Sequence, residues 1–211
     1  APQSFTMNKY PDAPQDLLCQ GEAEPQQLNT QAPAFSWTFS DPDVGDTQGA
    51  YRLLVATGPE VLDNDTGDMW DSGRITSAMS SGIAYDGVGL SWGETYYWKA
   101  RTWDDHGLGG AYSEARSFRL SALPDPPLAP LCDGHTNPMA IANLVPVFSW
   151  IFSDADPGDT QTAYRLLVAS SYDLLVQDIG DMWDSGKVSS SASEDIPYAG
   201  QALSWGTAYA W

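Results

Sequence analysis

The chain contains an internal repeat. Shifted by 113 positions, the sequence aligns with itself without a gap, and 42 of the 80 residues from Cys19 to Trp98 are identical to their partners. The longest identical runs are Ala50–Ala56 with Ala163–Ala169 and Gly67–Gly73 with Gly180–Gly186. A repeat of this kind means that one structural unit is used twice. We therefore predict two domains of the same fold, which suits a length of 211 residues.

The residue pattern indicates β-strands. Short runs rich in Val, Ile, Tyr, Phe and Trp alternate with clusters of Gly, Pro, Asp and Ser, which is typical of a β-sandwich. Asp accounts for 22 of the 28 acidic residues, and Asp favours turns over helices. Only Tyr172–Leu175 suggests a helical turn. In the first repeat we predict strands near 26–30, 34–40, 50–57, 69–76, 82–86, 95–103 and 112–120.

The formal net charge of −19 excludes several partners. A surface this acidic repels the phosphates of nucleic acids and anionic membranes. No apolar run approaches the roughly 18 residues of a membrane span, so we expect no membrane insertion. Cys19 and Cys132 are equivalent in the repeat, and in an extended array they lie too far apart for a mutual disulfide. They are expected to be free and buried, or paired with another subunit.

Four motifs, in order, resemble the fibronectin type III superfamily: Phe35–Trp37, Gly45–Arg52, Trp70–Gly73 and Tyr96–Asp104. Within it they are most like a bacterial and archaeal branch that occurs as tandem modules in large surface proteins and at the front of α-L-rhamnosidases. The resemblance covers nearly the whole chain. It implies an all-β protein of two tandem fibronectin type III or immunoglobulin-like β-sandwiches, the second lacking its last strand.

The resemblance also implies which aromatic residues fill the cores. A tryptophan on the second strand is expected between the sheets, and a tyrosine is expected at the tyrosine-corner position, with its hydroxyl bonded to nearby backbone. A second tryptophan follows that tyrosine on the same face. The core residues so implied are Trp37, Tyr96 and Trp98 in the first repeat and Trp150, Tyr209 and Trp211 in the second.

The two ends of the sequence do not coincide with the ends of a repeat unit. Ser4, Phe5, Thr6 and Met7 align with residues 117–120, and Trp211 aligns with Trp98. The predicted organisation is a strand at 1–10 equivalent to the last strand of a preceding module, a first module at 11–120, a stiff Pro-rich linker at 121–131, and an incomplete second module at 132–211.

Three hypotheses for function follow. An open sheet edge invites another strand, so residues 4–7 of one copy could complete the second module of the next, giving a non-enzymatic extracellular filament or fibre built head-to-tail from copies of the chain. Alternatively, the 211 residues are an excerpt of a longer tandem array that acts as a surface stalk. The other class is a carbohydrate-binding or adhesive accessory module of a larger surface protein or glycoside hydrolase. The Asp-rich, Cys-poor composition and the family favour an extracellular or cell-surface location.

Two Asp-rich turns are candidate calcium sites. Each places three carboxylates within six residues together with a glycine, and short loops of this kind coordinate Ca²⁺ through oxygen atoms. The alternative is that the Asp side chains only cap a turn through their own backbone. No other cofactor is expected. The candidate ligands are Asp41, Asp43 and Asp46 in the first repeat and Asp154, Asp156 and Asp159 in the second.

Several aromatic residues are candidates for glycan contact. In Gly67–Gly73 a tryptophan stands beside Asp and Ser, which is typical of sugar-binding surfaces, but we favour a structural interpretation: a turn, a strand whose Trp packs inward and a second turn. Trp92, Trp103 and Trp205 are better candidates for exposed stacking platforms.

No constellation of residues indicates catalysis. His106 and His135 are not repeat equivalents, and the sequence shows no Ser-His-Asp order, phosphate-binding glycine loop or zinc spacing. We therefore expect no enzymatic activity. Asn64–Thr66 is an N-glycosylation sequon that the second repeat lacks.

Overall fold

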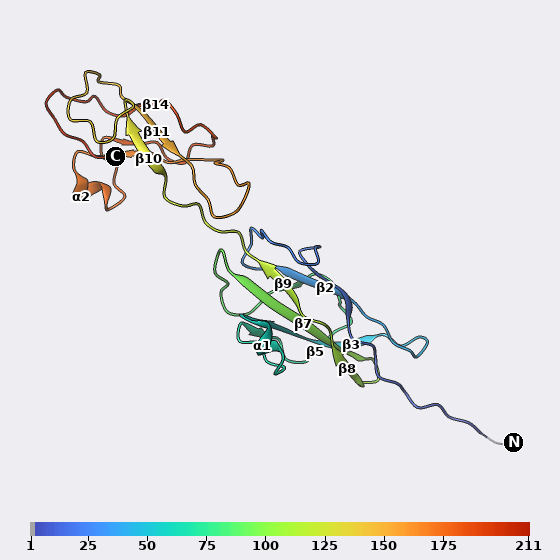
Figure 1. Ribbon diagram of the computed structural model, residues 1–211. Coiled ribbons are helices and arrows are strands. Elements are labelled where there is room, and N and C mark those ends of the chain that lie inside the picture. The colour runs from blue at the N-terminus through green and yellow to red at the C-terminus, as the bar shows by residue number, and fades with distance from the viewer. Residues whose placement is uncertain (1–2) are drawn as a thin grey trace. The chain divides into compact units, whose positions relative to one another are not determined.

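The computed structural model describes residues 3–211. The chain divides into two compact units, Ala1–Ala122 (unit 1) and Leu123–Trp211 (unit 2). Within the described residues the only α-helices are two single turns, α1 (Pro59–Leu62) and α2 (Tyr172–Leu175), and the remaining regular structure is antiparallel β-strand (Figure 1). The predicted all-β class with immunoglobulin-like or fibronectin type III-like units is confirmed.

Unit 1 consists of two antiparallel sheets. The smaller has the strand order β1-β2-β6, and the larger has the order β4-β3-β7-β8, with β5 also paired to β3 and β9 paired to β7. The two longest strands, β3 and β7, form the centre of the larger sheet. The strand bounds are β1 (Gln15–Cys19), β2 (Ala34–Thr38), β3 (Gln48–Ala56), β4 (Trp70–Asp71), β5 (Ile75–Thr76), β6 (Ile83–Ala84), β7 (Thr95–Asp104), β8 (Gly109–Tyr112) and β9 (Arg116–Arg119).

The main core of unit 1 lies between these sheets. Alternation on β2 turns Phe35 and Trp37 inward, toward apolar residues of β3, β7 and β9. Trp98 on β7 and Phe118 on β9 are fully buried in this core. A smaller apolar cluster beneath α1 contains Leu62 and covers the other face of β3, so β3 is buried on both faces.

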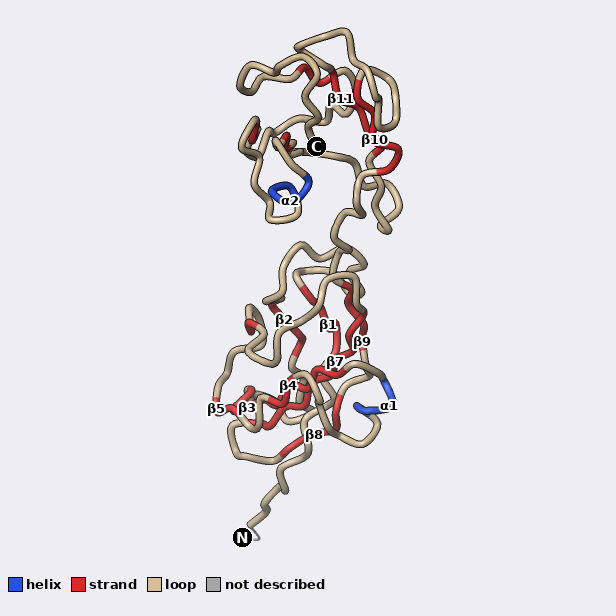
Figure 2. Tube along the Cα trace, turned by 90° about the vertical axis from the view of Figure 1, so that its left-hand side faces the viewer, coloured by secondary structure: helices blue, strands red, loops and turns tan. Residues whose placement is uncertain are grey.

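Unit 2 repeats part of this arrangement. Its strand orders are β10-β11-β14 and β12-β13, and each strand lies at or within the position of a unit 1 strand shifted by 113 residues. Figure 2 shows that its strands are short and joined by long loops. The 211-residue sequence holds no residues at the positions that match β8 and β9. The bounds are β10 (Leu128–Cys132), β11 (Val147–Ile151), β12 (Leu167–Val168), β13 (Trp183–Asp184) and β14 (Ile196–Pro197).

The inner geometry of the two units is nearly the same. The indole Nε1 of Trp37 donates to Gln48 Oε1 at 2.9 Å, and that of Trp150 donates to Gln161 Oε1 at 2.7 Å. The rings of Phe148 and Trp211 lie 4.7 Å apart, against 4.6 Å for their unit 1 counterparts. Identical residues at identical spacing therefore rebuild the same contacts.

Each unit also fixes one turn with a tyrosine hydroxyl. Tyr96 on β7 accepts a hydrogen bond from the backbone N–H of Ser91 at 2.9 Å. Tyr209 accepts one from Ser204 at 3.1 Å. Both tyrosines thus hold the turn that precedes them, as at a tyrosine corner.

The strand predictions differ from the structure in several places. The segment expected as a strand at 26–30 forms only a bridge between Leu28 and Leu120, although Pro25 and Leu28 share backbone hydrogen bonds with residues 119 and 121. The strand expected at 69–76 is divided into β4 and β5, and the one expected at 112–120 is divided between β8 and β9. Strand β1 and helix α1 were not predicted. The helical turn expected at Tyr172–Leu175 is present as α2.

The segment predicted as a linker belongs largely to unit 2. Strand β10 begins at Leu128, inside the predicted linker 121–131, and the backbone N–H of Asp125 donates to Ser153 O at 2.9 Å. Residues 3–10, predicted as a strand, form none within the described chain and are exposed. Residues 1 and 2 of that predicted strand lie outside the described residues.

Candidate functional site

The predicted calcium ligands lie close together in both units. In each loop, one oxygen atom from each of the three Asp residues lies within 4.8 Å of the others. The loops are also held by their own backbone: the N–H of Asp43 donates to Asp41 Oδ1, and that of Asp156 donates to Asp154 Oδ1, both at 2.8 Å. Such turn-capping bonds account for Asp41 and Asp154 without an ion, whereas Asp41 Oδ2 and Asp46 Oδ2 are buried and have no hydrogen-bond partner among the described residues. Calcium binding therefore stays a prediction.

The acidic loop of unit 1 has cationic neighbours. The backbone N–H of Lys9 donates to Asp43 at 2.6 Å and its ammonium lies 3.3 Å from the same carboxylate, so the pKa of Asp43 is lowered. The pKa of Asp46 is raised, first by burial and then by neighbouring carboxylates, although His106 lies 3.4 Å away. In unit 2 the position of Lys9 is taken by Ala122, which carries no charge.

The tryptophan of the Gly67–Gly73 motif points into the core. The Trp70 ring packs against Tyr85 at 5.4 Å and Phe35 at 6.4 Å. The adjacent carboxylate of Asp71 accepts two bonds from Arg52, at 2.8 and 2.6 Å. Unit 2 repeats both features at Trp183 and Asp184, with Arg165 as the cation. The motif therefore holds the edge of the sheet together, and the arginine–aspartate pair is a feature that the sequence prediction missed.

A shallow hollow lies beside this motif in unit 1. It has a volume of about 400 Å³ and is bordered by strands of both sheets. Met79 and Ile75 stand exposed at its rim, 57% and 40% accessible. Its lining residues are Tyr51, Trp70, Asp71, Ser72, Ile75, Met79, Gly82, Ile83, Ala84 and Asp86. Aromatic edges next to carboxylates and apolar side chains form a surface that a sugar ring can contact.

The three predicted stacking platforms differ in exposure. Trp92 packs against the main core of unit 1. The guanidinium groups of Arg74 and Arg101 lie over the Trp103 ring, 4.9 and 5.0 Å from its centre. The ring therefore already contacts two cations. Trp205, the repeat partner of Trp92, is 65% exposed.

The two cysteines, His135 and Asn64 are the other side chains that the sequence analysis names. Cys19 and Cys132 are free and buried, and burial raises the pKa of their thiols to about 12 and about 11. The ring Nδ1 of His135 lies 2.7 Å from the Asp133 carbonyl oxygen, and its backbone forms a bridge with Cys132. The side chain of Asn64 is exposed and donates to Glu60 O.

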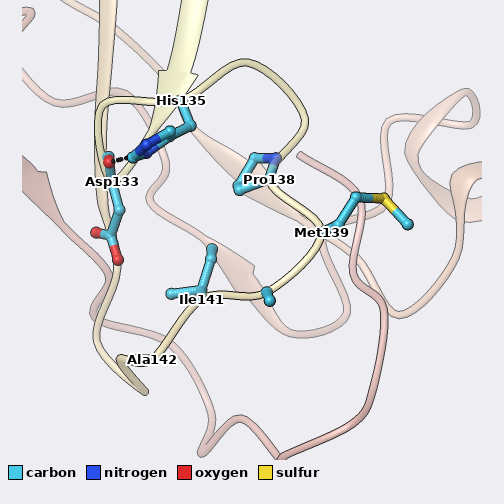
Figure 3. A pocket seen from close by; sticks show the side chains of 7 residues that line it. Asp133, His135, Pro138, Met139, Ile141 and Ala142 are labelled. Atoms are coloured by element: carbon cyan, nitrogen blue, oxygen red, sulfur yellow. Dashed lines mark hydrogen bonds between the residues drawn. The ribbon is translucent and has the colours of Figure 1, made fainter.

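Unit 2 has a pocket of its own, of about 290 Å³. Figure 3 shows Pro138 and Ile141 facing this space, with Met139 at its margin and the His135 ring on the far side. The other lining residues are Asp133, Ala140 and Ala142. Sequence reasoning did not identify this pocket, because it lies in a loop without a motif.

A family model described as "Rha78A-like, N-terminal immunoglobulin domain" matches residues 14–124 and again residues 127–211. The chain belongs to this family. The two matches correspond to the two repeats, so each unit is one such immunoglobulin domain. The resemblance to the front modules of α-L-rhamnosidases is thereby confirmed.

Relatives with a similar sequence include α-L-rhamnosidases. The one from Streptomyces avermitilis is 43% identical over 151 residues, which are 71% of this chain and 14% of the enzyme. One from Formosa agariphila is 31% identical over 107 residues, 51% of this chain and 11% of the enzyme. The chain thus spans a small part of the length of these curated relatives.

Solved structures agree on the fold. The α-L-rhamnosidase from Dictyoglumus thermophilum superposes with a TM-score of 0.51 at 22% identity, over 65% of this chain and 16% of that one. The Streptomyces avermitilis enzyme complexed with L-rhamnose gives 0.50 at 26% identity, over 53% and 11%. Separately, a search of the described residues finds no helix with the length and apolar character needed to span a bilayer.

Proposed function

We propose that the chain is a non-catalytic accessory part of a glycoside hydrolase of the α-L-rhamnosidase type. The observation that carries this proposal is the double match to an N-terminal immunoglobulin domain that precedes the bulk of such enzymes. Two ion pairs are consistent with it, because Arg52 and Arg165 bind the carboxylates of Asp71 and Asp184 at a sheet edge in the same way in both units. The comparisons favour this alternative over the filament as the main role.

A hydrolysis assay tests the first part of the proposal. The purified chain is expected to release no aglycone from an aryl α-L-rhamnoside above the buffer rate, because cleavage needs two suitably spaced carboxyl groups facing the glycosidic bond. A rate that falls on replacing a carboxylate of this chain would overturn the proposal.

We further propose that the hollow of unit 1 contacts carbohydrate. Its rim offers two side chains that unit 2 lacks: Met79 corresponds to Ala192, and Asp86 corresponds to Ala199. An apolar surface beside a carboxylate acceptor suits a sugar ring and its hydroxyls. The same role, with the Asp-rich composition, supports a location outside the cell.

Affinity electrophoresis in a gel that contains a rhamnose-bearing polysaccharide tests the carbohydrate contact. The double variant Met79→Ala/Asp86→Ala gives unit 1 the residues of unit 2, and both side chains are exposed, so the fold is expected to persist. Retardation should be lost in this variant. Val44→Ala, a change at a fully exposed residue away from the hollow, is the matched control and should migrate as the parent does. Equal retardation of all three proteins would exclude the hollow as the contact.

A further inference from the structure

Positive charge gathers on one face of the larger sheet of unit 1, where β3, β7 and β8 lie side by side (Figure 1). Arg52 on β3 and Arg101 on β7 are cross-strand partners, so their side chains lie on the same face. Arg101 is also the partner of Tyr112 on β8, and Trp103 follows it on the same face of β7. Arg74, between β4 and β5, places its guanidinium over the Trp103 ring. We call these five residues the arginine face.

The cations of the arginine face differ in their partners. Arg52 donates two hydrogen bonds to Asp71, at 2.8 and 2.6 Å, and is thereby neutralised. Arg101 donates through Nε to Gly110 O at 2.7 Å, and neither Arg101 nor Arg74 forms an ion pair with any described residue. The chain has 28 acidic and only 9 basic side chains, so carboxylates are abundant. Two guanidinium groups without one, at a single ring, are therefore a local excess of positive charge.

This arrangement disfavours the folded chain unless an anion is bound. Like charges directly opposite each other on neighbouring strands repel, and Arg52 and Arg101 stand in this relation. Cation–π contacts offset part of the repulsion, because the guanidinium carbon atoms of Arg101 and Arg74 lie 5.0 and 4.9 Å from the centre of the Trp103 ring. These contacts hold the two groups in place but leave their charge unneutralised. An anion that contacts both groups would remove the repulsion.

The aromatic rings of the arginine face are fixed and partly exposed. Trp103 and Tyr112 are both half-buried. Gly109 on β8 lies against the edge of the Trp103 ring, and a Cβ there would collide with the indole Nε1. The ammonium of Lys99 lies over the Tyr112 ring, 4.5 Å from its centre. Rings that are held in this way and remain partly open to solvent can contact the apolar face of a sugar.

We propose that the arginine face binds an acidic sugar residue of a polysaccharide, with the carboxylate or sulfate group on Arg74 and Arg101. This inference rests on the proposed function, which makes carbohydrate the class of ligand. A guanidinium presents a planar fork of donors that can bind two oxygen atoms of one anionic group at once.

The net charge of the chain narrows the ligand further. A charge of −19 repels a dense polyanion such as a nucleic acid. An isolated acidic group on an otherwise neutral sugar chain meets much less of this field, since salt screens charges beyond about 8 Å at physiological ionic strength. The favoured ligand is therefore a polysaccharide with sparse acidic groups.

The arginine face adjoins the hollow of unit 1. Asp71, which lines the hollow, is the carboxylate bound to Arg52. Ile75, at the rim of the hollow, directly follows Arg74 in the chain. The two surfaces therefore meet at β4 and β5 and can serve one polysaccharide.

NMR titration of the 211-residue chain, followed by the Trp103 indole N–H and the Arg74 Nε–H signals, tests the proposal. The probes are trigalacturonate, its methyl ester, which keeps the rings without the charge, and galactose 6-sulfate. Trigalacturonate or galactose 6-sulfate should shift both signals, and the one that binds more tightly identifies the acidic group. The methyl ester should bind at least about tenfold more weakly than trigalacturonate, because it lacks the charged acceptor. Equal binding of the acid and its ester, or no shift with either acidic sugar at millimolar concentration, would overturn the proposal.

Matched variants locate the contact. Arg74→Gln removes one cation at an exposed residue outside the strands, and it should weaken binding of the acidic sugar by at least about tenfold. Lys187→Gln, at the repeat partner of Arg74 in unit 2, changes the net charge equally and should leave binding unchanged. Arg74→Lys keeps the charge without the planar fork and should lie between the parent and Arg74→Gln. Equal weakening by Arg74→Gln and Lys187→Gln would show only an effect of net charge and would overturn the proposal.

Further outcomes separate this inference from its alternatives. Poly-glutamate that shifts the same signals while both acidic sugars do not would assign the arginine face to an acidic peptide instead. If the parent is retarded by the rhamnose-bearing polysaccharide but binds no acidic sugar, this inference fails and the proposed function stands. If acidic sugars bind at the arginine face while Met79→Ala/Asp86→Ala migrates as the parent does, the carbohydrate contact lies here and not in the hollow.

Discussion

The two units build the same core from the same residues but close it to different degrees. Trp98 and Leu90 are buried in unit 1, whereas their partners Trp211 and Leu203 are half-buried in unit 2. The aromatic contacts beneath them are nonetheless equal to within 0.1 Å for the Phe–Trp pair of each unit. Local sequence therefore sets how the rings pack, and in unit 1 the central strand β7 with its neighbours β8 and β9 covers them.

The largest effect should come from a matched pair of alanine variants. Phe118→Ala removes a fully buried ring and should lower the free energy of unfolding of unit 1 by about 3–5 kcal/mol. Phe5→Ala, its repeat partner, should change it by less than about 0.5 kcal/mol at concentrations where the chain is monomeric. Urea denaturation followed by tryptophan fluorescence measures both. A similar loss in the two variants would show that Phe5 is packed in the folded chain rather than exposed.

A second pair should show equal losses in the two units. Gln48 accepts from Trp37 and donates to two backbone carbonyls, and Gln161 makes the same three bonds. Gln48→Leu and Gln161→Leu each leave buried polar groups without partners, so each should destabilise its own unit by about 1–3 kcal/mol. The measurement is again urea denaturation. If only the unit 1 variant is destabilised, the shared contacts are not equivalent in energy.

A smaller effect should appear in acid. Hydrogen bonds from Arg165 and from the backbone of Gly186 lower the pKa of Asp184 to about 2, from an ordinary value of 3.8, and Arg52 lowers the pKa of Asp71. Because the folded state holds these carboxylates ionised, they stabilise it above pH 3.8, and this contribution is lost as the pH falls through about 2. Asp184→Asn should therefore flatten the pH dependence of stability over this range. Melting temperatures measured between pH 2 and pH 5 check this prediction. If the melting temperature of Asp184→Asn depends on pH as steeply as that of the parent, the Arg165–Asp184 pair has no such role.

The smallest expected effect concerns calcium. In unit 1 Lys9 already neutralises Asp43, whereas its repeat partner Ala122 offers no cation. If the acidic loops bind Ca²⁺, the ion should raise the melting temperature of unit 2 more than that of unit 1, and a chelator should reverse the rise. Asp154→Asn should remove the unit 2 response. Identical melting with calcium and with chelator would exclude the site.

The sequence predicts the overall fold better than it predicts the short helices and strands. The repeat and the alternation of buried and partly exposed residues in β2 are patterns that local residues determine, and the structure contains them. Helix α1 has only four residues, Pro59–Leu62, too few to show a helical period, and it is held by packing against β3 and β7. Its repeat partner Tyr172–Leu175 was predictable because its two leucines are adjacent to an aromatic residue and an acid.

The candidate site was only partly accessible to sequence reasoning. The acidic loops are local, so spacing alone brings their carboxylates together. The hollow of unit 1 joins Tyr51, Ile75 and Asp86, which come from separate strands and loops and meet only after the sheets have packed. Trp103 was predicted as an exposed platform. Arg101 lies two positions before it on the same face of β7, whereas Arg74 reaches it through a tertiary contact that no local pattern encodes.

The backbone hydrogen bond from Asp125 to Ser153, which anchors the start of unit 2, has a practical consequence for anyone who wishes to express one unit alone. Residues ahead of a unit are bonded to that unit, by Asp12 in one case and Asp125 in the other. A truncation that starts unit 2 at Cys132 would delete β10 and this anchor together, whereas one that starts at Leu123 keeps both. Gene fragments for single-unit work are therefore best cut just after Ala122.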